Sequence, residues 1–249
     1  MSNVKERPII FDAASVLAIL RNEKSQTRRL VKPQPELGKP WKYGWIVDPE
    51  CMDVPLAYCP YGVIGDRLYA KEVWRAFIDP DSDEPSIEYR ADGALVTYPE
   101  APAGRWDDVK YEEWQYRINE QGCADCEKAG IVPNDEGAYI WKEGKCPIRW
   151  RSGRFMPRWA SRILLEVTER RIQRIQDISA EDVEAEGINV TRHWPLIPPV
   201  DLSDEQLDAL ILRVAHRLMK KRWDSLYAAK GHPFDANDWV WAISFRRVE

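Results

Sequence analysis

Four arginines and one tryptophan form the first group of residues whose chemistry points to a ligand. Arg28 and Arg29 are adjacent near the start of the chain, and Arg158 and Arg162 flank Trp159 further along. A guanidinium presents paired N–H donors that match a phosphate, and an indole ring can stack on a nucleobase. These residues therefore predict a substrate-binding contact with a nucleotide or nucleic acid. The alternative is structural: Trp159 fills the core, and the arginines pair with acidic residues from the middle of the chain.

Cysteines form the second group. Cys123 and Cys126 stand in a Cys-x-x-Cys arrangement, and Cys146 could supply a third thiolate, with Cys59 or Cys51 as the fourth. Four thiolates around one zinc ion make a closed, structural site. The alternative is a set of free buried thiols. A thioredoxin-like role is not expected, because no βαβ pattern surrounds the pair.

Several common enzyme classes have no support in the sequence. The three histidines, His193, His216 and His232, show no ligand spacing. The chain also has no glycine-rich phosphate loop, no Ser-His-Asp order and no His-Glu-x-x-His motif.

Composition limits the kind of protein that can position these groups. The chain has 249 residues, of which 44% are hydrophobic and 31% charged, and these shares are usual for a globular protein. We expect a single domain over 1–249, with an acidic insertion at 92–157 that carries tryptophans and cysteines. No apolar run reaches the roughly 18 residues of a membrane helix, and the N-terminus has no apolar signal core. The expected location is therefore the cytoplasm, where cysteines stay reduced.

Charge is distributed unevenly along the chain. The formal net charge is −5, yet residues 145–174 contain nine basic and two acidic side chains, and residues 1–32 are also basic. Residues 79–136 are the reverse, with sixteen acidic and five basic side chains. The two basic segments could form one phosphate-binding face if the fold brings them together. The alternative is that the charges are simply spread over solvated surface.

Local patterns predict an α+β fold with short strands at both ends of the chain. Asp12 is a good N-cap for a first helix, and Ser179 and Ser203 are good N-caps for two later ones. Residues 33–66 and 92–157 show no sustained periodicity, so both are expected to be loops. Strands are expected at 8–11, 27–31, 67–74, 163–167, 171–175 and 239–245.

Several short sequence motifs in this chain resemble those of the ASCH family of the PUA-like superfamily, in a branch of phage and prophage proteins. The resemblance covers both ends and the middle of the chain and leaves most of residues 92–150 outside it. The motifs are Lys24-Ser25-Gln26-Thr27-Arg28-Arg29, Gly65-Asp66-Arg67-Leu68, Glu184-Ala185-Glu186-Gly187-Ile188, the strand from Val240 to Val248, Cys59-Pro60-Tyr61-Gly62 and Met156-Pro157-Arg158-Trp159-Ala160-Ser161-Arg162.

The resemblance implies a fold as well as a class of ligand. The implied fold is a PUA-like mixed β-barrel with flanking helices and a long inserted loop region. Residues 5–31, 66–91 and 158–247 would then build one barrel, because exposed strand edges at both chain ends need partners. The implied ligand is RNA or a modified nucleoside.

The resemblance also implies three catalytic residues. Small ASCH enzymes that hydrolyse N(4)-acetylcytidine use a lysine, a threonine three residues on and a glutamate near the end of a later helix. Lys24, Thr27 and Glu186 match these positions here. Glu186 would act as the base, Thr27 as the nucleophile or its positioner, and Lys24 as the cationic partner.

We therefore expect a protein that binds a modified nucleoside or nucleic acid in a basic cleft and hydrolyses an acyl amide on cytosine. The alternative is a noncatalytic RNA- or DNA-binding reader or a phage accessory protein. The choice between RNA, DNA and free nucleoside stays open, as does the oligomeric state.

Overall fold

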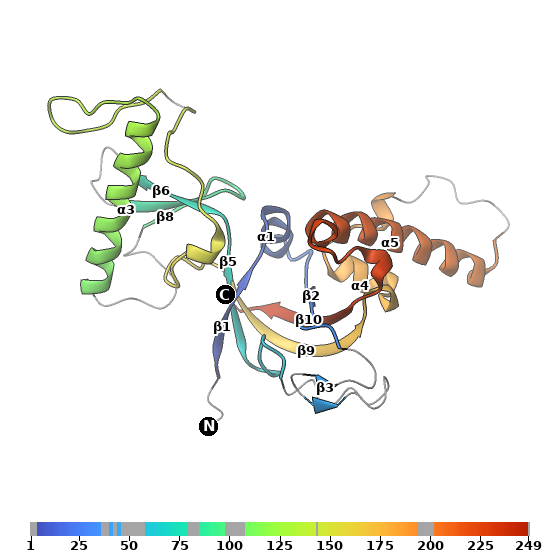
Figure 1. Ribbon diagram of the computed structural model, residues 1–249. Helices are drawn as coiled ribbons and strands as arrows, with labels where there is room; N and C mark the ends of the chain where they lie inside the picture. Colours follow the sequence, from blue (N-terminus) through green and yellow to red (C-terminus); the bar gives the residue numbers. More distant parts are fainter. Residues whose placement is uncertain are drawn as a thin grey trace. The chain divides into compact units, whose positions relative to one another are not determined.

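A computed structural model describes residues 4–35, 40–41, 44–45, 58–78, 85–97, 108–142, 144–193 and 202–248. It shows a mixed α+β fold in which the chain divides into two compact units (Figure 1). Unit 1 comprises residues 1–7, 18–68 and 165–249, and unit 2 comprises residues 8–17 and 69–164.

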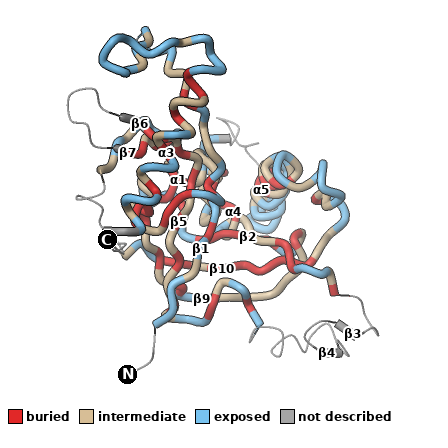
Figure 2. The backbone as a smooth tube through the Cα atoms, turned by 60° about the vertical axis from the view of Figure 1, so that its left-hand side comes forward, coloured by how far each residue is buried: buried red, intermediate tan, exposed pale blue. Residues whose placement is uncertain are grey.

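Five strands form the largest sheet, in the order β1-β5-β9-β10-β2. Strand β10 lies between β9 and β2 and is antiparallel to both. Because β10 has a neighbour on each side and is covered on both faces, its residues from Trp239 to Ile243 are all buried (Figure 2). The strands are β1 (Glu6–Ile10), β2 (Gln26–Leu30), β5 (Arg67–Lys71), β9 (Leu164–Arg174) and β10 (Trp239–Arg247).

Helices α4 (Ala180–Ala185) and α5 (Asp204–Tyr227) cover one face of the sheet in unit 1 (Figure 1). Their apolar side chains pack with Leu30 of β2 and Val240 of β10, which are opposite each other in the strand register. Both helices begin at the predicted serine caps. Ser179 Oγ accepts from the N–H of Asp182, and Ser203 Oγ accepts from that of Gln206. The first helix, α1 (Ala13–Leu20), also begins as predicted, because the Asp12 carboxylate accepts from the Ser15 N–H.

Unit 2 has its own antiparallel sheet and its own core. Strands β6 (Trp74–Ile78), β7 (Pro85–Tyr89) and β8 (Leu95–Thr97) form the sheet, and helix α3 (Asp108–Lys128) lies beside it (Figure 1). Trp74, Trp114 and Trp159 pack together at the centre of this core with Ile87 and Tyr89. Trp223, Trp239 and Trp241 are buried as well, so at least six of the twelve tryptophans serve packing.

The predicted α+β class is confirmed, but the prediction of one closed barrel is wrong. Among the described residues, the five-stranded sheet ends at β1 and β2, and β6 and β7 belong to a separate sheet rather than to a barrel over 66–91. The segment 92–157 is also more ordered than the predicted loop, because it contains α3 and β8.

Smaller differences concern strand continuity and short pairings. The runs at 163–167 and 171–175 belong to one strand, β9, whose register against β10 shifts between Ser244 and Phe245. Most of the predicted loop at 33–66 lies outside the described residues. Its described part includes one short pairing between β3 (Pro40–Trp41) and β4 (Gly44–Trp45). None of the helices in the described ranges combines the length and apolar content needed to cross a bilayer.

Candidate active site

Lys24 lies in the short connection between α1 and β2. Asn22 adopts a left-handed conformation with φ of 58°, and the Glu23 N–H donates to the Ala18 carbonyl, so the chain turns out of α1 within a few residues. Strand β2 then begins at Gln26. Because side chains alternate along a strand, Gln26 and Arg28 share one face and Thr27 and Arg29 share the other.

Asp182 and Glu186 come from α4 and its C-terminal end. They are four residues apart and so lie on one side of the helix. The Ser25 N–H donates to the Ala185 carbonyl at 2.9 Å, which joins the end of α4 to the start of β2. Gly187 allows this approach: it has φ of +80°, and a Cβ there would lie 3.1 Å from the Cβ of Lys24.

The central contact of the site joins Lys24 to Glu186. Lys24 Nζ donates to Glu186 Oε2 at 2.5 Å and to the Glu186 backbone carbonyl at 2.8 Å. The two side chains are only 3% and 9% exposed. Burial lowers the pKa of Lys24 below its usual value, although the Glu186 carboxylate opposes that effect. The site thus holds a buried ammonium that gives up its proton more readily than a surface lysine.

Arg28 links both carboxylates of the site. Its guanidinium is completely buried and donates to Asp182 Oδ2 at 2.6 Å and to Glu186 Oε1 at 3.3 Å. Asp182 also accepts from Gln26 and Arg171. Burial alone would raise the pKa of Asp182, but the charges of Arg28 and Arg171 and the Gln26 hydrogen bond together lower it.

The structure brings together two of the three predicted catalytic residues. Lys24 and Glu186 are in direct contact, whereas Thr27 is 4% exposed and lies on the face of β2 opposite Gln26 and Arg28. Arg29 shares the face of Thr27, and its charge also lowers the pKa of Lys24. The nucleophile assigned to Thr27 therefore stays a prediction.

Three residues of the site were not predicted: Gln26, Arg171 and Asp182. Gln26 could have been found from its alternation with Arg28, and Asp182 from its spacing to Glu186. Arg171 gives no such local signal. It reaches Asp182 only because β9 lies next to β10 in the sheet.

The later group of predicted binding residues lies in unit 2. Trp159 is 0% exposed, and its ring meets that of Trp114 edge-on at 5.0 Å, so it serves the core. Arg162 Nε donates to Glu72 at 2.9 Å, and Arg162 Nη1 donates to Asp92 at 2.7 Å. The Arg158 guanidinium lies over the Tyr69 ring at 4.5 Å. For Trp159 and Arg162 this placement matches the structural alternative, and their binding role stays a prediction.

The cysteines fall in both units. Cys123, Cys126 and Cys146 belong to unit 2, where the two other thiols add to the effect of burial in raising the pKa of Cys126. Cys59 belongs to unit 1, and Cys51 lies outside the described residues. No group of three or more His, Cys, Asp or Glu side chains within the described ranges is arranged to hold a metal ion. Zinc therefore stays a prediction.

Comparisons with known proteins add no assignment: no protein-family model, curated protein or solved structure matches the chain. The ASCH resemblance accordingly stays a prediction based on the motifs quoted above.

Proposed function

We propose that the chain binds an acylated pyrimidine nucleoside, free or within a nucleic acid, and hydrolyses its acyl amide with Lys24 and Glu186. The observation that carries the proposal is the buried contact of 2.5 Å between Lys24 Nζ and Glu186 Oε2. A carboxylate beside an ammonium of lowered pKa can take and return a proton, as amide hydrolysis requires.

The proposed reaction uses water as the nucleophile, because Thr27 lies on the opposite face of β2. Glu186 accepts a proton from water while the water oxygen attacks the acyl carbon. The Lys24 ammonium stabilises the negative oxygen of the tetrahedral intermediate. The C–N bond then breaks, the proton returns from Glu186 to the amino nitrogen, and the products are a carboxylic acid and the free nucleobase amine.

Release of acetate from N(4)-acetylcytidine tests this proposal. Glu186→Gln should lower kcat by at least about a hundredfold, because it removes the base. Glu184→Gln is the matched control, since it makes the same change on the same helix at an exposed residue. Among the described residues, the Glu184 carboxylate accepts a hydrogen bond only from the Thr191 hydroxyl. Thr27→Ala should retain activity if water is the nucleophile. A fall in kcat as large as that of Glu186→Gln would instead identify Thr27 as the nucleophile.

Folding must be separated from catalysis in this experiment. Glu186→Gln removes the carboxylate that compensates a buried lysine, which destabilises a fold. The double variant Lys24→Met/Glu186→Gln removes both charges and should fold while remaining inactive. Its thermal unfolding curve and its nucleoside affinity are therefore measured alongside its turnover.

A noncatalytic reader is the second candidate, and a specific observation favours it. Glu186 already binds Lys24 and Arg28, and Asp182 binds Gln26, Arg28 and Arg171, so the network can serve to join β2 to α4. Nucleoside binding by wild type without acetate release would select this candidate. If wild type shows no nucleoside binding and no turnover, both candidate functions are excluded.

A further inference from the structure

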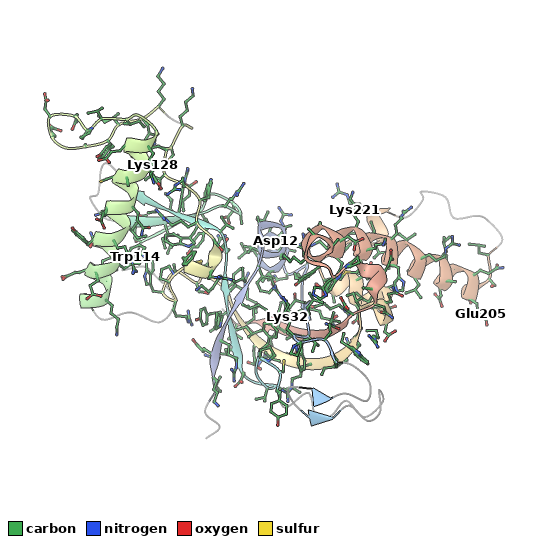
Figure 3. The ribbon with its side chains drawn as sticks, viewed as in Figure 1. Asp12, Lys32, Trp114, Lys128, Glu205 and Lys221 are labelled. Carbon is green, nitrogen blue, oxygen red and sulfur yellow. The ribbon has the colours of Figure 1, made fainter. Side chains whose placement is uncertain are left out.

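Unit 2 contains a cavity of about 510 Å³, separate from the Lys24–Glu186 contact. This volume is within the range of small-molecule binding sites, roughly 300–1,000 Å³. Its walls come from β6, from α3 and from the segment 149–155. Trp114, labelled in Figure 3, is one of the residues that α3 contributes. The side chains that matter for binding are Trp74, Trp114, Trp150, Phe155, Arg117 and Arg151.

Trp74 provides a hydrogen-bond donor that the described protein does not use. Its side chain is 1% exposed and lines the cavity, yet its indole Nε1 has no hydrogen-bond partner among the described residues. A buried N–H without an acceptor is costly, and tryptophans in such places usually have one. An acceptor atom on a bound ligand would satisfy this donor.

Arginines give the cavity an excess of positive charge. Arg149 and Arg151 both pair with one buried carboxylate, that of Asp125, at 2.5 and 3.5 Å. Arg151 Nε has no hydrogen-bond partner among the described residues, and exposed Arg117 adds a third cation. The described residues that line the cavity include three arginines and no acidic residue, which favours an anionic ligand, and the paired N–H donors of a guanidinium suit a phosphate.

Arg151 is held close to Trp74 by the backbone. The Arg151 N–H donates to the Trp74 carbonyl at 2.6 Å, and the Trp74 N–H donates to the Arg151 carbonyl at 3.2 Å. The unused indole donor and the partly used guanidinium therefore belong to neighbouring positions on two joined segments.

Two aromatic rings on the same segment offer surfaces for stacking. Phe155 is 69% exposed although it lines the cavity, and Trp150 lies under the Arg75 guanidinium at 4.4 Å. An exposed ring beside arginines is a stacking platform for a nucleobase, because every base has a flat π face. From the rings, the cations and the unused donor together, we propose that this cavity binds a phosphate-bearing nucleobase: a free nucleotide or the end of a nucleic-acid strand.

Isothermal titration of the full chain tests the site with defined probes: cytidine, cytidine 5′-monophosphate, inorganic phosphate and a 5′-phosphorylated tetranucleotide. The monophosphate should bind at least about tenfold more tightly than cytidine or phosphate alone, because it uses rings and cations together. A tetranucleotide that binds much more tightly than the monophosphate identifies a strand as the source. Equal affinities identify a free nucleotide.

Three substitutions and two matched controls locate the binding. Phe155→Ala should weaken nucleotide binding roughly tenfold, whereas Tyr116→Ala, at an exposed aromatic residue of α3 outside the cavity wall, should not. Arg117→Gln should weaken binding of the monophosphate but not of cytidine, with Arg154→Gln as its control. Trp74→Phe keeps an aromatic ring and removes the N–H, and should weaken binding several-fold.

Three results would overturn the proposal. These are no binding by either phosphorylated probe, binding that survives both Phe155→Ala and Arg117→Gln, and tighter binding of a tyrosine-phosphorylated peptide than of any nucleotide. The test does not depend on the proposed hydrolase activity. The double variant Lys24→Met/Glu186→Gln, which leaves no uncompensated buried lysine, should retain this binding, so failure of one proposal can be told from failure of the other.

Discussion

At the scale of single residues, Gly187 is required where α4 meets the chain leaving α1. It combines a left-handed backbone with close contacts, since an added Cβ would lie 3.0 Å from Ala18 and 3.1 Å from Lys24. Gly187→Ala should therefore lower the free energy of unfolding by roughly 2–3 kcal/mol, because backbone strain and a steric clash add.

Gly231 supplies the control for Gly187. It has a similar φ of +84° in the same unit, but an added Cβ there would meet nothing within 4 Å. Gly231→Ala should cost only about 1 kcal/mol, the strain alone. Urea unfolding of both variants measures the difference, and equal losses would show that the contact with Lys24 is not tight.

Asp182 should make the stability of the fold depend on acidic pH. Its pKa lies below the ordinary 3.8 in the folded protein, so the unfolded state binds more protons as the pH falls. Its stabilising contribution is therefore complete above about pH 4 and is lost as the pH falls through the folded pKa. Asp182→Asn should cost roughly 3 kcal/mol at pH 7, because Arg28 loses a buried partner.

Two unfolding series, at pH 7 and near pH 3, check the prediction for Asp182. The difference between wild type and Asp182→Asn should narrow at the lower pH. Asp208→Asn, at an exposed position of α5, should change the free energy of unfolding by less than about 0.5 kcal/mol at both pH values. A constant difference for Asp182→Asn would show that its charge does not stabilise the fold.

At the scale of elements, the short helix α4 positions both site carboxylates and depends on its cap. It has six residues, and Ser179 Oγ accepts from the Asp182 N–H at 3.2 Å. Ser179→Ala should cost about 1 kcal/mol of stability and should also reduce turnover, because Glu186 stands at the other end of the same helix. Ser203→Ala removes a similar cap from α5 and should lower stability alone. Equal effects of the two variants on turnover would contradict the positioning role of α4.

Helix α3 provides the test of the zinc prediction. It carries Cys123 and Cys126 about one turn apart, and the thiol of Cys146 contributes to the raised pKa of Cys126. Chain purified without a chelator should contain about one zinc ion if these thiols and a fourth ligand form a site. Cys59→Ser and Cys51→Ser then identify the fourth ligand. Metal-free protein in which all three thiols react with a thiol reagent would establish the free-thiol alternative.

Elements whose ends are set by local chemistry could be predicted from the sequence, and α3 could not. Asp12, Ser179 and Ser203 each cap a helix through their own side chain, which is a local signal. Helix α3 has little apolar surface beyond Tyr111, Trp114 and Ile118, spaced three and four residues apart. It is stabilised by packing against strands from another part of the chain, and an apolar stripe of three residues is too short a signal to reveal that packing.

At the scale of the whole molecule, the features that the sequence alone did not predict are those that depend on pairing between distant segments. Lys24 and Glu186 are 162 residues apart, and their contact was expected only from a family resemblance, because no spacing rule links them. The predicted barrel failed for a related reason. Closure depends on which distant strands pair, and β6 (74–78) pairs with β7 (85–89) in a separate sheet.

Whole-molecule electrostatics gives the last prediction, which concerns the salt dependence of nucleic-acid binding. The chain has a net charge of −5, and several cations of the basic segment 145–174 already have acidic partners. Arg149 and Arg151 pair with Asp125, and Arg162 pairs with Glu72 and Asp92. A cation that is already paired releases fewer counterions when it meets a phosphate, so the nine basic residues of this segment should not all contribute to binding.

The expected slope therefore follows from the cavity of unit 2, which has three arginines in its wall. Because Arg149 and Arg151 are already paired with Asp125, the slope of log affinity against log salt should lie between about −0.7, the value for Arg117 alone, and about −2, the value for three full phosphate contacts to a single strand. Arg117→Gln should make the slope shallower by about 0.7, whereas Arg158→Met should leave it unchanged. A slope steeper than about −5, or one that becomes shallower in Arg158→Met, would indicate that the phosphate is bound by the arginines around Trp159 and not by the cavity. Titrations of a fluorescent single-stranded oligonucleotide at four salt concentrations distinguish these outcomes.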